Sequence, residues 1–256
     1  MINFKILLKQ IRFRFFGCSK KKMKRLLHWG PIIALLIIKC ISLTTLYFTG
    51  LWLNIRYNIW LSLINYTLYY GLLASTLYNF FCAIIIGPDY VPKGWRPESN
   101  DDDVKYLQYC HQCDGYKAPR SHHCSKCKRC ILKMDHHCPW INNCCGYRNQ
   151  KYFFNFLLSA VIGSLQSSLL LSITLYRALT FTPNIDRHYI HLTIRDAFLI
   201  LISIGMAIGV VFAVGFLLYL QVYSGCWVEL FFFHFLNFIL DKNNHLESYQ
   251  YWRLDY

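Results

Sequence analysis

The sequence predicts an all-α integral membrane protein with four transmembrane helices and, between helices 2 and 3, a small cytosolic cysteine-rich domain of loops and short β-hairpins. Of its 256 residues, 55% are hydrophobic and 18% aromatic, whereas a soluble domain is usually about 45–50% apolar. Four runs reach the length of about 20 mainly apolar residues that a bilayer core requires. Eight of the twelve cysteines lie together in the polar segment between the second and third runs.

The four predicted spans are Gly30–Leu53, Trp60–Ile86, Phe153–Tyr176 and Ala197–Tyr223. The alternative is a soluble domain that buries all four helices, but a chain of 256 residues rarely contains four such runs. The spans divide the chain into 1–28 (basic cytosolic lead), 29–86 (helices 1 and 2), 87–150 (cysteine-rich domain), 151–223 (helices 3 and 4) and 224–256 (cytosolic or interfacial tail).

The positive charge indicates the orientation of these spans. The net charge is +14, with nine Lys and Arg before the first span and eleven more between residues 87 and 151. The two other loops contain only four arginines. Because basic residues concentrate on the cytosolic side of a membrane protein, both termini and the cysteine-rich domain are predicted to face the cytosol. The charge follows the membrane flanks, so we expect no nucleic-acid partner.

The two ends of the chain carry weaker signals. Phenylalanines among the basic residues of 1–28 are typical of a lead that lies on acidic lipid headgroups, and a solvated basic tail is the alternative. No cleavable signal peptide is expected, because the first apolar run follows a long basic lead and is itself long enough to span. Beyond the fourth span, Trp227–Leu240 is apolar but too short to cross, which favours an interfacial or re-entrant segment.

The segment Cys110–Cys145 combines metal-ligand spacing with the parts of a reactive cysteine. Its Cys-x2-Cys pairs lie close to histidines, a pattern typical of zinc sites in a reducing compartment. Two sites of three cysteines and one histidine would use six of the eight thiols, and spacing alone leaves the pairing open. In the run Asp135–Cys138, a carboxylate and imidazoles precede a thiol, which are the parts of an activated nucleophile. The alternative is that Cys138 is a further zinc ligand.

This segment resembles the cysteine-rich domain of the DHHC family, whose members are membrane-embedded protein S-acyltransferases. The match runs without a gap from Cys110 to Gly146. The residues that carry it are Cys110, Cys113, Lys117, Pro119, Arg120, His123, Cys124, Cys127, Cys130, Asp135, His136, His137, Cys138, Pro139, Trp140, Asn143, Cys144 and Gly146.

The resemblance implies a role for most cysteines and histidines of the segment. Carried over position by position, it implies two interleaved structural zinc sites. The expected ligands are Cys110, Cys113, His123 and Cys130 for one site and Cys124, Cys127, His137 and Cys144 for the other. Cys138 would be the nucleophile, His136 the general base and Asp135 the group that orients it. Cys145 is left over, and we interpret it as a packing residue rather than a spare thiol or an acylation target.

The implied activity is a two-stage, ping-pong protein S-palmitoyltransferase. Cys138 would take the acyl group of palmitoyl-CoA or a similar acyl-CoA, and a cytosolic-face cysteine of a membrane protein would then accept it. Because each buried methylene contributes about 0.8 kcal/mol, the acyl chain should lie between apolar helices in the lipid bilayer. An accessory protein is a further expected partner. The basic residues available for the CoA phosphates, none of them assigned singly, are Lys93, Arg96, Lys117, Arg120, Lys126, Lys128, Arg129 and Lys133.

The third span has a face of small residues, which suits either an acyl cavity or a helix-packing seam. Its members are Gly163, Ser164, Ser167 and Ser168.

One branch of the family is especially similar. The runs His28–Leu35, Tyr78–Phe81, Gly87–Pro88 and Tyr106–Cys110 resemble the endoplasmic-reticulum branch, whose members carry a Src-homology-3-like domain at the C-terminus. The resemblance covers about residues 28–223 and implies the endoplasmic reticulum, with the Golgi as the alternative location. The sequence ends at Tyr256, so we expect no room for the additional domain.

The tail departs from the family and keeps a second function open. A Thr-Thr-x-Glu motif is expected after the fourth span, and its two candidate registers, Cys226–Glu229 and Asn244–Tyr249, both lack the threonines. The second register makes Ser224–Phe235 an insertion. An inactive, zinc-stabilised membrane scaffold is therefore the alternative function. A channel or transporter is disfavoured, because it needs ionisable groups inside the spans and Lys39 is the one charged residue there.

Overall fold

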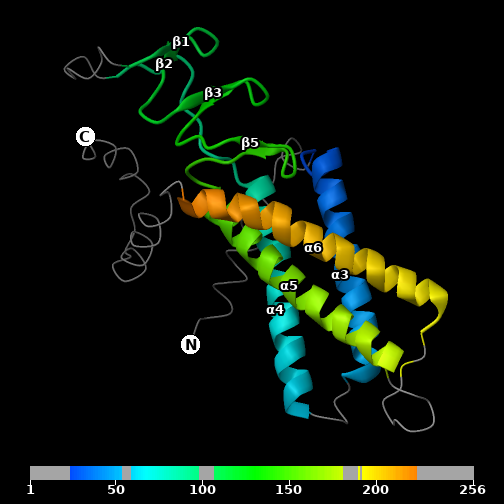
Figure 1. Cartoon of the computed structure of the whole chain (residues 1–256). Helices are drawn as coiled ribbons and strands as arrows, with labels where there is room; N and C mark the ends of the chain where they lie inside the picture. The colour runs from blue at the N-terminus through cyan, green and yellow to red at the C-terminus, as the bar shows by residue number, and fades with distance from the viewer. Residues whose placement is uncertain (1–23, 54–58, 98–106, 181–189, 191, 224–256) are drawn as a thin grey trace.

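The computed structural model describes residues 24–53, 59–97, 107–180, 190 and 192–223, which form a helical bundle with short strands gathered at one end (Figure 1). The helices are α3 (Trp29–Trp52), α4 (Ile59–Ile85), α5 (Gln150–Thr180) and α6 (Ile194–Tyr223). Each is long and apolar enough to cross a membrane. Helix α5 packs against both α4 and α6. The predicted class is confirmed: four membrane helices with the cysteine-rich domain inserted between the second and the third.

The helices match the predicted spans closely, and the largest difference is at α5. The apolar run covers 153–176, but the helix begins at Gln150 and ends at Thr180. A hydropathy run stops at the first polar residues, whereas helical hydrogen bonds continue through them; Gln150 N donates to Gly146 O at 2.9 Å. The predictions for 1–23 and 224–256, including the short apolar run and both motif registers, lie outside the described residues.

The cysteine-rich domain consists of three two-stranded antiparallel hairpins, as predicted. They pair β1 (Tyr109–Cys110) with β2 (Gly115–Tyr116), β3 (His122–Cys124) with β4 (Arg129–Ile131), and β5 (His137–Cys138) with β6 (Asn143–Cys144). Each turn contains a left-handed residue, Asp114 (φ 52°), Lys128 (φ 53°) or Asn142 (φ 46°). The first two turns reverse the chain at Cys110-x2-Cys113 and Cys124-x2-Cys127, so that thiols from neighbouring hairpins converge.

Two buried asparagines fasten this domain to the end of α4. The last four carbonyl groups of a helix have no partner within the helix, and here side chains supply the donors. Asn143 Nδ2 lies 3.1 Å from Ile86 O and 3.2 Å from Ile84 O. Asn149 Nδ2 lies 3.2 Å from Ala83 O. These hydrogen bonds fix strand β6 and the start of α5 against the end of α4, close to the run Asp135–Cys138.

Candidate functional site

The first group of metal-ligating side chains joins the first two hairpins. Cys110 ends β1 and Cys113 lies in the β1–β2 turn, while His123 and Cys130 are directly opposite each other in the β3–β4 register. His123 Nδ1 lies 3.4 Å from each of the first two sulfurs and 3.8 Å from Cys130 Sγ. All four donor atoms lie within 4.8 Å of one another.

The second group repeats this arrangement one hairpin further along. Cys124 and Cys127 belong to the β3–β4 hairpin, and His137 and Cys144 are cross-strand partners in β5–β6. His137 Nδ1 lies 3.7 Å from Cys124 Sγ and 3.5 Å from each of the other two sulfurs. The donor atoms again lie within 4.8 Å. The middle hairpin contributes to both groups, so the two sites are interleaved.

Both groups have the donor set and the dimensions of a tetrahedral zinc site. With Zn–S bonds of about 2.3 Å and Zn–N bonds of about 2.0 Å, tetrahedral geometry places ligand atoms about 3.5–3.8 Å apart. The S···N distances of 3.4–3.8 Å fit this requirement. The Cys127–Cys144 sulfur separation of 3.3 Å is far too long for a disulfide bond. The eight residues that form these two groups are the eight expected ligands.

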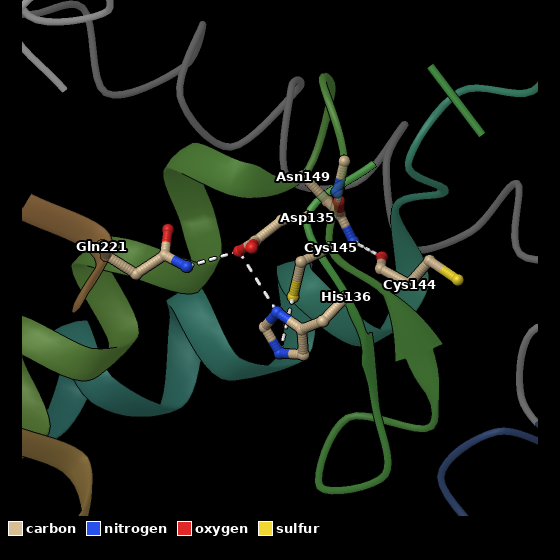
Figure 2. A network of polar contacts seen from close by, with 7 residues as sticks. Asp135, His136, Cys144, Cys145, Asn149 and Gln221 are labelled. Atoms are coloured by element: carbon tan, nitrogen blue, oxygen red, sulfur yellow. Dashed lines mark hydrogen bonds and ion pairs between the residues drawn. The ribbon is translucent and has the colours of Figure 1, made fainter. Parts of the chain in front are cut away.

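Asp135 and His136 form an ion pair directly before β5 (Figure 2). Their backbone extends the β5–β6 pairing: Asp135 N donates to Cys145 O at 3.0 Å, and Cys145 N donates to His136 O at 2.8 Å. This pairing places His136 Nδ1 3.1 Å from Asp135 Oδ2. The hydrogen bond from His136 holds the pKa of the Asp135 carboxyl below its usual value, so the carboxylate stays ionised.

The His136 ring also contacts two thiols, Cys145 through Nε2 and Cys138 through a side-chain hydrogen bond. Burial alone would lower the pKa of His136, but hydrogen bonds with Asp135, Cys138 and Cys145 outweigh it and raise the pKa to about 12. Phe153 packs edge-on against the ring, with 5.4 Å between ring centroids. Since Asp135 engages Nδ1, Nε2 is the nitrogen available to the thiols. Asp135 therefore orients the ring and stabilises the protonated form that His136 takes when it holds a thiol proton.

The two thiols beside His136 differ in their surroundings. Cys145 Sγ lies 3.8 Å from His136 Nε2, and Cys145 is completely buried in the core. Burial raises the pKa of the Cys145 thiol to about 12. Cys138 is also buried, but it borders a cavity between the membrane helices, whereas Cys145 is absent from the cavity lining. Only one of these two thiols can therefore meet a molecule bound in the cavity.

The cavity measures about 410 Å³ and extends from Cys138 and Trp140 into the helical bundle. Helices α3, α4, α5 and α6 all contribute to its lining, and the surface facing it is almost entirely carbon. Three members of the small-residue face line it, namely Gly163, Ser164 and Ser167, while Ser168 does not. Such a cavity suits a slender apolar ligand. Tyr69 and Ser167, which both line it, are joined by a hydroxyl contact of 3.1 Å.

The structure brings together all the expected site residues and adds two features that sequence reasoning missed. The first is the contact of Cys145 with His136, although burial agrees with the interpretation of Cys145 as a packing residue. The second is Gln221, near the end of α6, whose side-chain amide donates to Asp135 Oδ2. These residues are 86 positions apart. No local spacing pattern could have connected them.

These features define a class: a multi-pass membrane protein with two Cys3His metal sites and a His-paired cysteine at an apolar cavity. The family model described as DHHC palmitoyltransferase matches residues 103–250, which is more than half of the chain. The chain therefore belongs to the DHHC palmitoyltransferase family.

Individual relatives agree with this assignment. Palmitoyltransferase ZDHHC6 of Homo sapiens is 42% identical over 216 residues, which covers 78% of this chain and 52% of the relative. The Danio rerio protein of the same name is 42% identical over 223 residues, with the same coverage. Probable protein S-acyltransferase 13 of Arabidopsis thaliana is 41% identical over 114 residues, covering 38% of each chain. The chain thus spans about half the length of the ZDHHC6 relatives.

Proposed function

We propose that this protein is a protein S-palmitoyltransferase. It moves a long-chain fatty acyl group from acyl-CoA, through a thioester on Cys138, to cysteines of membrane-associated proteins. The observation that carries the proposal is the position of Cys138, which contacts His136 and borders the apolar cavity. A nucleophile at that boundary can meet a buried acyl tail and a polar headgroup at the same time.

In the first stage, the sulfur of Cys138 attacks the thioester carbonyl of acyl-CoA. A bond forms between the carbonyl carbon and this sulfur, and the bond to the CoA sulfur breaks. The proton of the Cys138 thiol passes to His136 Nε2 and then to the departing CoA sulfur. Asp135 keeps Nδ1 protonated and stabilises the charge that His136 gains.

In the second stage, the thiol of a substrate protein attacks the Cys138 thioester. His136 accepts the proton of that thiol and returns it to Cys138 as the acyl group leaves. The acyl chain stays in the cavity through both half-reactions, because returning it to water would cost about 0.8 kcal/mol per methylene. Only the head of the thioester needs to be accessible to the acceptor.

The two metal groups support this chemistry structurally. Zinc, when bound, holds together hairpins that are too small to have a hydrophobic core of their own. His137 and Cys144, the cross-strand ligands of β5–β6, would fix the strand that carries Cys138. His136 and His137 thus have different roles, the first in proton transfer and the second in metal binding.

The expected setting follows from the charge and the family branch. The basic lead and the basic cysteine-rich domain favour a cytosolic position for both termini and for the active site. The branch resemblance favours the endoplasmic reticulum, with the Golgi as the alternative. The substrates would be proteins whose cysteines lie at the cytosolic surface of the same membrane.

The test is acyl labelling of the purified full chain with a clickable palmitoyl-CoA, followed by hydroxylamine. We expect a hydroxylamine-sensitive label that is lost in Cys138→Ser and kept in Cys145→Ala. The second variant is the matched control, because Cys145 also contacts His136 but does not border the cavity. A labelled chain whose label is unaffected by Cys138→Ser would overturn the assigned nucleophile.

The second candidate function is an inactive membrane scaffold that binds partner proteins. It is favoured by the altered residues at the expected Thr-Thr-x-Glu motif. The labelling experiment separates the two functions. If a folded chain with two bound zinc ions acquires no label, the enzyme function is rejected and the scaffold takes its place.

A further inference from the structure

Gln221 lies in the last turn of α6 and contacts Asp135 of the proposed catalytic pair (Figure 2). It is not among the residues that line the cavity. Its side-chain Nε2 donates to Asp135 Oδ2, the same oxygen that pairs with His136 Nδ1 at 3.1 Å. Gln221 is 6% exposed. One carboxylate oxygen thus receives two donors, one from the adjacent His136 and one from Gln221, which lies 86 residues from Asp135 in the sequence.

We propose that Gln221 is a positioning residue that holds the Asp135 carboxylate in the orientation in which it aligns His136. This inference rests on the proposed function, because Asp135 and His136 are taken as the orienting group and the proton-transfer group. It assigns to a residue of the fourth membrane helix a part in the chemistry of the cysteine-rich domain.

The physical reason is the freedom of an aspartate side chain. Rotation about its last torsion meets only a broad, low barrier, and both Asp135 and His136 are about one-third exposed, at 34% and 36%. With one partner, the carboxylate could turn toward water and leave the imidazole misaligned. A second donor, fixed by a helix, removes that freedom. A displacement of about 1 Å at a reacting group can cost about 100-fold in rate.

A glutamine suits this role better than a charged donor. Its amide is neutral, so it orients the carboxylate without competing with His136 as a counter-ion. It also reaches Asp135 from a rigid element: residues 210, 214, 217 and 221 follow one face of α6 at helical spacing. The first three of these, Val210, Val214 and Leu217, line the cavity. The helix that would contact the acyl chain therefore also carries the donor to Asp135.

The test measures the rate of Cys138 acylation in full-length Gln221→Met, which keeps the side-chain length but has no donor. Because Gln221 does not line the cavity, we expect the maximal rate to fall about 10- to 100-fold with the half-saturating acyl-CoA concentration unchanged. Gln221→Glu, which replaces the donor with a carboxylate that repels Asp135, should show a loss at least as large. Gln166→Met is the matched control, because Gln166 bonds Asn65 at 3.0 Å within the bundle, away from Asp135.

The decisive measurement repeats Gln221→Met in an Asp135→Ala background, following residual acylation over hours. If Gln221 acts through Asp135, the second substitution has no further effect. Two outcomes would overturn the inference. One is that Gln221→Met lowers the acylation rate as much in the Asp135→Ala background as in the wild-type background. The other is that both Gln221 variants acylate at the wild-type rate. Zinc content and thermal midpoint of each variant identify a folding defect, and such a defect in both Gln221 variants also counts against a positioning role. An unlabelled wild-type chain would instead reject the proposed function.

Discussion

Gly30, in the first turn of α3, lies against the turn that follows Cys138. A Cβ atom placed on Gly30 would be 2.0 Å from the carbonyl oxygen of Pro139 and 3.0 Å from the Cα of Trp140. Both are backbone atoms, so no side-chain rotation can relieve the overlap. We therefore predict that Gly30→Ala displaces the turn that carries the proposed nucleophile.

The size of the displacement follows from contact distances. A carbon and a carbonyl oxygen approach to about 3.3 Å, so helix α3 and the Pro139 turn must separate by about 1.3 Å along that line. Overpacking of this kind typically costs about 1–3 kcal/mol of stability, which a folded chain can tolerate. A shift of about 1 Å at the reacting group can lower a rate by about 100-fold. We therefore expect Gly30→Ala to lose most of its acylation activity while the protein remains folded.

The assay is the single-turnover rate of Cys138 acylation in detergent, with zinc content measured on the same samples. Gly205→Ala is the control, since a Cβ there meets no atom within 4 Å and alanine favours a helix over glycine by about 1 kcal/mol. We expect the control to match the wild type while Gly30→Ala falls by about 100-fold. A folded Gly30→Ala variant within threefold of the wild-type rate would refute the reasoning.

Three further predictions concern the metal sites, the end of α4 and the cavity. A strong chelator should release two zinc ions per chain, one from each Cys3His group, and abolish acylation; release of fewer ions on complete unfolding contradicts the assigned ligands. Asn143→Leu removes the donor to the carbonyl groups at the end of α4, and each carbonyl left without a partner costs about 1–3 kcal/mol of stability. The thermal midpoint should therefore fall measurably, and an unchanged midpoint would argue against this attachment. Gly163→Leu should narrow the cavity and shift preference toward shorter acyl chains, by roughly fourfold for each methylene denied burial. Competition between C12 and C16 acyl-CoA checks this, and an unchanged preference would place the chain elsewhere.

The sequence was sufficient to predict the four spans and the ligand set. Membrane insertion depends on the length and apolarity of a continuous run, which are local properties, and α3 (Trp29–Trp52) differs from its predicted span by one residue at each end. The eight ligands likewise lie within Cys110–Cys144, where short Cys-x2-Cys spacing leaves few geometries. The pairing of these ligands followed from the family resemblance, because spacing alone allowed other combinations.

Other features depended on contacts between distant segments. Both Cys138 and Cys145 are adjacent to a zinc ligand in the sequence and contact His136, yet only Cys138 borders the cavity built by all four helices. The position of that cavity depends on how the helices pack, which no local pattern specifies.

Sequence by itself therefore determined the class of protein, its membrane helices and the residues able to bind metal or act as a nucleophile, because run length and close spacing express those properties directly. Tertiary structure alone separated the thiol that faces the cavity from the one that does not. It also brought Gln221 to Asp135 across 86 residues and placed Asn143 beneath the end of α4. All three features depend on the packing of the whole bundle, which brings together segments that are far apart in the sequence.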